Sequence, residues 1–222
     1  MPRALDLFAG THSFTKQAQE LGWDCISLDC DIKSGATITA DILEFDYTIW
    51  PPGHFDFIWA SPPCTTFSIA CAHLFSAEER DRRAAGGCEV ARRTKEIVEY
   101  LQPQWYAIEN PLASKLWSMG IFDEYPKKKL SYCMYGFPYR KNTILATNTP
   151  FEPKLCRGDC GFVREVVDQN GKTRKHHLEV AKQGCSQQCR GLGVQQTTHT
   201  RGQLYRVPAG LIKDVLESVS GR

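Results

Sequence analysis

Short apolar runs alternate with helical patterns through most of the chain, and this alternation limits the folds that it can adopt. The runs predict strands at residues 4–8, 23–28, 37–39, 55–60, 105–108, 130–134 and 143–147, and the helical patterns predict helices near residues 14–21, 77–101, 112–119 and 207–216. Strands that alternate with helices are typical of a doubly wound α/β sheet with mostly parallel strands. The sequence therefore predicts a main domain built around such a sheet.

The composition is that of a water-soluble globular protein. Of the 222 residues, 42% are apolar and 23% are charged, and the formal net charge is +2. No apolar run approaches the roughly 20 residues that a membrane-spanning helix needs, and the first ten residues are too soon acidic for a signal peptide. We therefore expect a soluble, intracellular protein with reduced thiols and no membrane partner.

Two matched cysteine pairs lie in residues 149–204, where the alternation of strands and helices stops. The pairs are Cys156-x3-Cys160 and Cys185-x3-Cys189, a spacing consistent with a structural zinc site of four thiolates. This region has few apolar side chains, so a bound metal would add stability that its core cannot supply. Two free or redox-active cysteine pairs are the alternative interpretation.

Other cysteines and histidines are less specific. His176 and His177 are alternative zinc ligands, but their basic neighbours favour a loop. Cys71, Cys88 and Cys133 are interpreted as structural cysteines.

Polar or sterically special residues follow several of the expected strands. They are the segment Phe8-Ala9-Gly10, Asp29, Asp41, the segment Pro62-Pro63-Cys64 and the segment Glu109-Asn110-Pro111. The carboxyl ends of parallel strands meet at one edge of the sheet, where open α/β folds bind ligands. The sequence therefore predicts a binding site at this edge.

Each of these segments also has a purely structural interpretation. Gly10 could serve a turn, Asp29 could be a solvated carboxylate, and Cys64 could be a structural cysteine in a tight loop. Asn110 and Pro111 fit the N-cap and first position of the helix expected at residues 112–119.

Together these segments resemble the motifs of the DNA (cytosine-5)-methyltransferase family. The matching stretches, in family order, are Asp6-Leu7-Phe8-Ala9-Gly10, Asp29-Cys30-Asp31, Ala40-Asp41-Ile42, Ser61-Pro62-Pro63-Cys64, Ile108-Glu109-Asn110-Pro111, the segment 136–142 and Tyr205-Arg206-Val207-Pro208. The resemblance covers residues 4–148 and about 204–219.

The resemblance implies a Rossmann-like methyltransferase that uses S-adenosylmethionine and acts on DNA. Cys64 would be the nucleophile that attacks C6 of a flipped cytosine, Glu109 would hold its N3/N4 edge, and Lys141 would keep a positive charge nearby. The implied cofactor-binding residues are Phe8, Ala9, Gly10, Thr11, His12, Ser13, Asp29, Cys30, Asp41, Ile42, Pro62 and Val207.

The resemblance also implies the domain boundaries. Residues 1–148 with 205–222 would form the catalytic domain, and residues 149–204 a small zinc-containing insertion that recognises the target. The cytoplasm of a prokaryotic or virus-infected cell, or a eukaryotic nucleus, is the expected location.

The chain departs from the family pattern at several positions. Thr11-His12-Ser13 replaces a glycine-rich turn, Thr65 replaces glutamine, Thr143 replaces an arginine, and Tyr205 replaces asparagine. Two alternative functions therefore stay open, an RNA (cytosine-5)-methyltransferase and a catalytically silent, zinc-containing module that binds nucleic acid.

Overall fold

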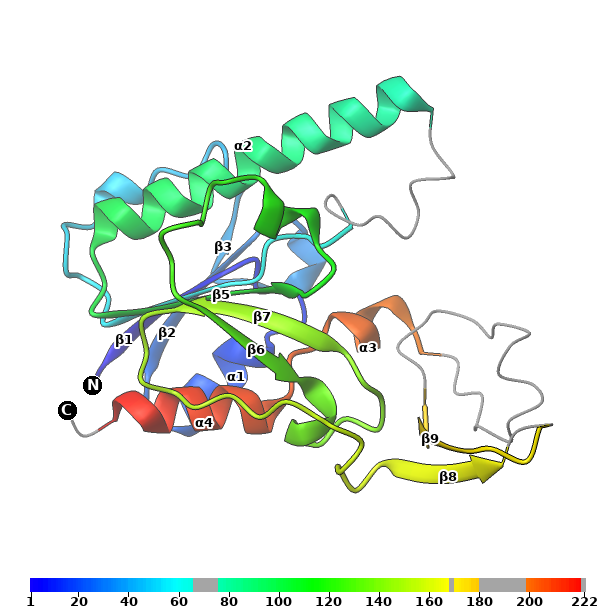
Figure 1. Cartoon of the computed structure of the whole chain (residues 1–222). Coiled ribbons are helices and arrows are strands. Elements are labelled where there is room, and N and C mark those ends of the chain that lie inside the picture. Colours follow the sequence, from blue (N-terminus) through cyan, green and yellow to red (C-terminus); the bar gives the residue numbers. More distant parts are fainter. Residues whose placement is uncertain (66–75, 168–169, 180–198, 221–222) are drawn as a thin grey trace.

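The computed structural model describes the chain apart from residues 66–75, 168–169, 180–198 and 221–222 (Figure 1). The strands are β1 (Arg3–Leu7), β2 (Asp24–Asp29), β3 (Ile38–Thr39), β4 (Phe57–Ala60), β5 (Trp105–Pro111), β6 (Lys127–Ser131), β7 (Asn142–Thr147), β8 (Val163–Val167) and β9 (Thr173–His177). The α-helices are α1 (Ser13–Glu20), α2 (Ala77–Leu101), α3 (Arg201–Tyr205) and α4 (Ala209–Val219). Short 3-10 helices include η2 (Tyr47–Ile49), η4 (Lys115–Ser118) and η5 (Tyr132–Tyr135).

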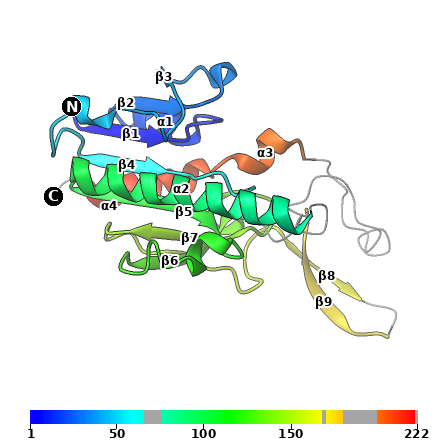
Figure 2. The same ribbon diagram turned by 90° about the horizontal axis from the view of Figure 1, so that it is seen from above.

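Seven strands form the central sheet in the order β3-β2-β1-β4-β5-β7-β6, which Figure 2 shows from above. The strands run parallel except β7, which is antiparallel to both β5 and β6. The chain moves outward from β1 through β2 to β3 and then returns to β4 on the other side of β1. A sheet of this kind binds its ligands beside the strand where the direction of winding changes. The expectation of a mostly parallel α/β sheet is confirmed.

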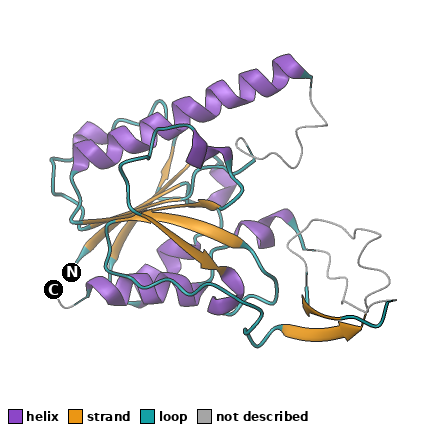
Figure 3. Cartoon of the chain, in the orientation of Figure 1, coloured by secondary structure: helices purple, strands orange, loops and turns teal. Residues whose placement is uncertain are grey.

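Helices cover both faces of the sheet, as Figure 3 shows. Helices α1 and α4 pack on one face, where Phe14 and Leu211 meet alternate strand residues such as Phe57 and Trp59. Helix α2 packs on the opposite face, where its apolar residues meet the intervening strand residues, such as Ile58. Strand residues point alternately to the two faces, so the continuous apolar run of β4 is buried on both sides.

The helix predicted at residues 77–101 coincides with α2, which Ser76 caps by accepting a hydrogen bond from the Glu79 amide. The helix predicted at residues 112–119 is wrong. Asn110 and Pro111 belong to strand β5, where they pair with Ile144 and Thr143 of β7, and only the 3-10 helix η4 follows. Pairing with a distant strand therefore outweighs the local capping signal.

Residues after β7 leave the central sheet. Strands β8 and β9 form a separate two-stranded antiparallel sheet, which extends beyond the main body of the molecule in Figures 1 and 2. Helix α4 then returns to the main sheet beside α1. Within the described ranges, no helix is long and apolar enough to cross a membrane.

Candidate active site

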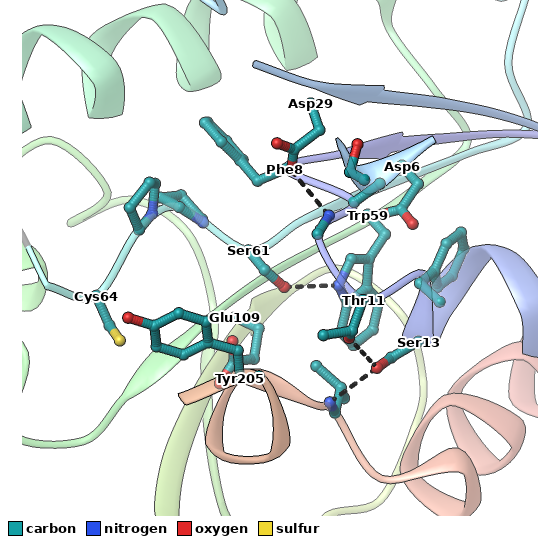
Figure 4. Close-up of a pocket in the computed structure, with 18 of the residues that line it drawn as sticks. Asp6, Phe8, Thr11, Ser13, Asp29, Trp59, Ser61, Cys64, Glu109 and Tyr205 are labelled. Carbon is teal, nitrogen blue, oxygen red and sulfur yellow. Dashed lines mark hydrogen bonds between the residues drawn. The ribbon is translucent and has the colours of Figure 1, made fainter. Parts of the chain in front are cut away.

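A cavity of about 510 Å³ opens beside the carboxyl ends of β1 and β4, where the winding of the sheet changes direction (Figure 4). It lies at the edge that the sequence predicts for a binding site. The predicted site residues that line it are Phe8, Ala9, Gly10, Thr11, Ser13, Asp29, Pro62, Cys64, Glu109, Lys141 and Val207.

The turn after β1 forms one wall of the cavity. Phe8 adopts a left-handed conformation with φ 66°, which is strained for a bulky residue, and Gly10 follows with φ 44°. The Gly10 amide donates a 2.8 Å hydrogen bond to Oδ2 of Asp29, and the Asp31 amide donates one of 2.8 Å to Oδ1. The Asp29 carboxylate therefore fixes the β1 turn against the end of β2.

The loop after β4 carries Cys64 and is anchored at two points. The Ser61 hydroxyl accepts a 2.9 Å hydrogen bond from the Trp59 indole, and the Pro62 carbonyl accepts one of 2.7 Å from the Asn110 amide side chain. Asn110 is only 1% exposed, so the second anchor is shielded from water. These contacts fix the backbone that leads to the half-buried Cys64.

Glu109, at the carboxyl end of β5, lies in a buried polar group. Its Oε1 accepts a 2.7 Å hydrogen bond from the Tyr132 hydroxyl, and the two residues are 6% and 0% exposed. The Lys141 ammonium group lies 4.6 Å from the centre of the Tyr132 ring, a favourable cation–π distance. Lys141 also donates a 3.4 Å hydrogen bond to the Leu204 carbonyl. A carboxylate and an ammonium group thus face the cavity beside the Cys64 thiol.

The electrostatic environment of Cys64 has opposing parts. Burial raises the pKa of its thiol above the usual range, the Lys141 charge lowers it, and the Glu109 charge raises it. Burial dominates, so the thiol is protonated at neutral pH in the ligand-free site.

The end of the chain closes another side of the cavity. The Val207 amide donates a 3.2 Å hydrogen bond to Oγ of Ser13, which lies 2.9 Å from Oγ1 of Thr11. Tyr205, at the end of α3, also lines the cavity (Figure 4). Thr11 and Ser13 therefore join the first turn to the segment before α4.

Four predicted cofactor residues do not line the cavity. Cys30 and Asp41 are exposed, and Asp41 accepts a hydrogen bond from the Leu43 amide. Ile42 is buried in the core on the α2 side, and the His12 ring lies 2.9 Å from the Ser34 carbonyl. Their cofactor contacts stay predictions.

Sequence reasoning did not single out three residues of this site. Asp6 lines the cavity and is 2% exposed, and its Oδ2 accepts hydrogen bonds from the Thr15 amide and hydroxyl. Burial raises the pKa of Asp6 from 3.8 to about 7. Trp59 lines the cavity, and Tyr132 contacts Glu109. Only Asp6 had a visible signal, its place in the first motif, since Trp59 and Tyr132 look like ordinary core residues.

A second group of reactive side chains lies outside the cavity. Ligand atoms of Cys133, Cys156, Cys160 and His177 all lie within 4.8 Å of one another. Cys133 is therefore not isolated in the core, and His177 ends strand β9 and does not lie in a loop. Cys185 and Cys189, the other predicted zinc ligands, and Cys71 lie outside the described residues.

Comparison with known proteins gives the family context. No family model matches the chain. A curated protein of Frog virus 3 (isolate Goorha), named "Probable DNA (cytosine-5)-methyltransferase", is 35% identical in a 227-residue alignment that spans 97% of this chain and 99% of the viral protein.

Two solved structures share the fold. The Entamoeba histolytica methyltransferase EhMeth has a TM-score of 0.54 at 13% identity and covers 98% of this chain and 97% of its own. A candidate DNA modification methyltransferase encoded within an E. coli prophage has a TM-score of 0.51 at 17% identity, covering 69% of this chain and 51% of its own. At such low identities these structures support the fold alone. The match to the viral protein, which extends over nearly the full length of both proteins, shows that the chain belongs to the DNA (cytosine-5)-methyltransferase family.

Proposed function

We propose that the chain transfers a methyl group from S-adenosylmethionine to C5 of a cytosine in DNA, through a temporary bond between Cys64 and C6. One observation carries the proposal. Cys64, Glu109 and Lys141 line the same cavity as the Phe8–Gly10 turn and Asp29. A nucleophile, a base-holding carboxylate and a nucleoside-binding turn thus share one site.

The cavity suits S-adenosylmethionine in size and chemistry. Its volume of about 510 Å³ lies within the range of small-molecule sites, about 300–1,000 Å³. Phe8, which is only partly buried, offers aromatic surface to an adenine ring. Each Asp29 oxygen accepts one backbone hydrogen bond and retains a lone pair for a ribose hydroxyl. When bound, the cofactor would supply an activated methyl group.

The residues of the chain would make the cytosine reactive toward that group. The Cys64 thiolate adds to C6, and the electron pair displaced from the C5–C6 bond makes C5 nucleophilic. Glu109 would hold the N3/N4 edge: one oxygen accepts a hydrogen bond from the N4 amino group, and the other carries a proton to N3, which neutralises the negative charge that the addition places on the ring. After methylation a solvent water molecule takes the C5 proton, the electron pair of the C5–H bond re-forms the C5–C6 double bond, and Cys64 departs as thiolate.

The Lys141 charge has a defined role in this scheme. It opposes the effect of burial on the Cys64 pKa and so increases the fraction of reactive thiolate. Because C6 is inaccessible inside a duplex, the target base must be flipped out of the stack or be unpaired.

The catalytic unit in this proposal comprises residues 1–148 and 205–222, and residues 149–204 recognise the target. The separate β8–β9 sheet within that region supports the division. DNA is the preferred substrate because the viral relative is named for DNA methylation.

A methyl-transfer assay tests the proposal. The purified full chain is incubated with labelled S-adenosylmethionine and either duplex DNA or RNA, and modified cytosines are located by sequencing. We expect label in C5 of DNA cytosines, none with Cys64→Ser, and normal transfer with Cys88→Ser as a matched control in α2. Transfer to RNA alone, or full transfer by Cys64→Ser, would contradict the proposal.

A further inference from the structure

We propose that Cys133, Cys156, Cys160 and His177 bind one zinc ion, which fastens the β8–β9 hairpin to the catalytic domain beside Tyr132. This ligand set differs from the four cysteines that sequence spacing suggests. Two of its members, Cys133 and His177, come from outside the matched cysteine pairs.

The distances fit a tetrahedral zinc site. The Nε2 atom of His177 lies 3.5 Å from Sγ of Cys156 and 3.4 Å from Sγ of Cys160. With zinc–sulfur bonds of about 2.3 Å and zinc–nitrogen bonds of about 2.0–2.1 Å, a tetrahedron places sulfur and nitrogen about 3.5 Å apart. The side chains are therefore already arranged around a point that an ion could occupy.

The donor chemistry is that of a structural zinc site. Three thiolates and one imidazole fill all four positions, which leaves none open for catalysis. The Gly158 amide also donates a 3.3 Å hydrogen bond to Sγ of Cys156, a contact that supports a metal-bound thiolate. Gly158 has φ 85°, a conformation that suits the tight turn between Cys156 and Cys160.

The β8–β9 sheet needs a stabilising contact that a zinc ion would supply. An isolated two-stranded sheet such as β8–β9 is only marginally stable in water. The Val167 side chain in β8 is 64% exposed, so burial of apolar side chains contributes little to the stability of this two-stranded sheet. Three cysteines cannot all pair with one another in disulfides, and all three are free thiols in the structure. One ion would satisfy all four ligands and tie the hairpin down.

The cluster also adjoins a residue that contacts the active site. Cys133 follows Tyr132, whose hydroxyl donates to Glu109. Ser131 accepts a hydrogen bond from the Cys156 amide at its hydroxyl and donates its own amide to the Lys154 carbonyl. Zinc would therefore brace the segment that positions Tyr132, in addition to holding the insertion.

Metal analysis of the purified full chain tests the ligand set. We expect about one zinc per chain, as a site with four protein ligands holds a single ion. Replacing Cys133 or His177 by alanine should remove most of the zinc. The double variant Cys185→Ser/Cys189→Ser and the neighbouring His176→Ala should retain it. Retention by Cys133→Ala and His177→Ala with loss in the double variant would overturn the proposal in favour of the four-cysteine set.

Cobalt substitution keeps the test decisive if the alanine variants do not fold. The wild-type chain loaded with Co²⁺ should show the visible bands of a tetrahedral site and thiolate-to-cobalt charge transfer. His177→Cys should still bind the metal, with its visible bands shifted to longer wavelength because sulfur replaces nitrogen. An unchanged spectrum in His177→Cys, or a wild-type protein that binds neither metal, would overturn the assignment.

Discussion

The Tyr132 hydroxyl donates a 2.7 Å hydrogen bond to Oε1 of Glu109, and both residues are almost fully buried. Burial and the Glu109 charge raise the pKa of Tyr132 far above its usual range, so its hydroxyl remains a donor at neutral pH. This contact joins the carboxylate that would hold the target base to the residue next to the proposed zinc site.

Tyr132→Phe should therefore slow methyl transfer more than it weakens substrate binding. Loss of one hydrogen bond to a charged group should cost about 1.5–3 kcal/mol of unfolding free energy, and a freer Glu109 should lower kcat about tenfold or more. Denaturant titration and steady-state kinetics measure the two effects.

Tyr47→Phe is the matched control. Tyr47 donates a 2.7 Å hydrogen bond to Glu96 on the α2 side of the sheet, away from the cavity. The Tyr47→Phe variant should have a lower free energy of unfolding and an unchanged kcat. Equal losses of kcat in both variants would show that Tyr132 has no special role.

Lys141→Met should raise the pKa of Cys64 further, because it removes the charge that opposes burial. The pH at which Cys64 becomes half-maximally reactive should move upward. Alkylation followed by mass spectrometry of the Cys64 peptide measures this shift. Lys33→Met, which removes another cavity-lining lysine, should leave the profile in place. An unchanged profile in Lys141→Met would contradict the assigned role.

Asp6→Asn should change how stability depends on pH. The pKa of Asp6 is raised from 3.8 to about 7, so folding disfavours its charged form. In the wild type, the contribution of Asp6 to the free energy of unfolding is therefore largest below about pH 4, where the carboxyl group is protonated in both the folded and the unfolded state. This contribution is lost as the pH rises to about 7. At about 1.4 kcal/mol per pKa unit, the loss is about 4 kcal/mol.

Urea titrations of the ligand-free protein across this pH range measure that loss. The difference in unfolding free energy between wild type and Asp6→Asn should shift in favour of the variant as the pH rises. Parallel curves would contradict a buried, raised pKa. Asp46→Asn provides a control, because hydrogen bonds from Thr48 lower the pKa of Asp46. The stabilisation from Asp46 is lost only below about pH 4, so the difference between wild type and this variant should stay constant across the range.

Asn110→Ala should loosen the loop that carries Cys64, because it removes the hydrogen bond to the Pro62 carbonyl. We expect kcat to fall about tenfold or more, since small displacements of a nucleophile are costly. Asn148→Ala removes a similar bond, of 2.9 Å to the Gln104 carbonyl, at the opposite end of β5. Kinetics that fall equally in both variants would indicate a general loss of structure.

The fold and the cavity could be predicted because their signals are local. Apolar periodicity marks the strands and α2, and Phe8, Asp29 and Cys64 follow strands whose ends meet at one edge. The strand ending at Pro111 could not be predicted, since its continuation depends on pairing with Thr143, far along the chain. The grouping of Cys133 with His177 likewise depends on tertiary contacts that no cysteine spacing reveals.

The covalent role of Cys64 is the central claim, and DNA that contains 5-fluorocytosine tests it most directly. Fluorine at C5 cannot leave as a proton does, so a Cys64 adduct should persist after methyl transfer. In a preparation that methylates ordinary DNA, we expect a denaturation-resistant protein–DNA complex with the base attached to the Cys64 peptide, and no complex with Cys64→Ser. An active wild-type enzyme that forms no complex, or a complex that persists in Cys64→Ser, would contradict the account.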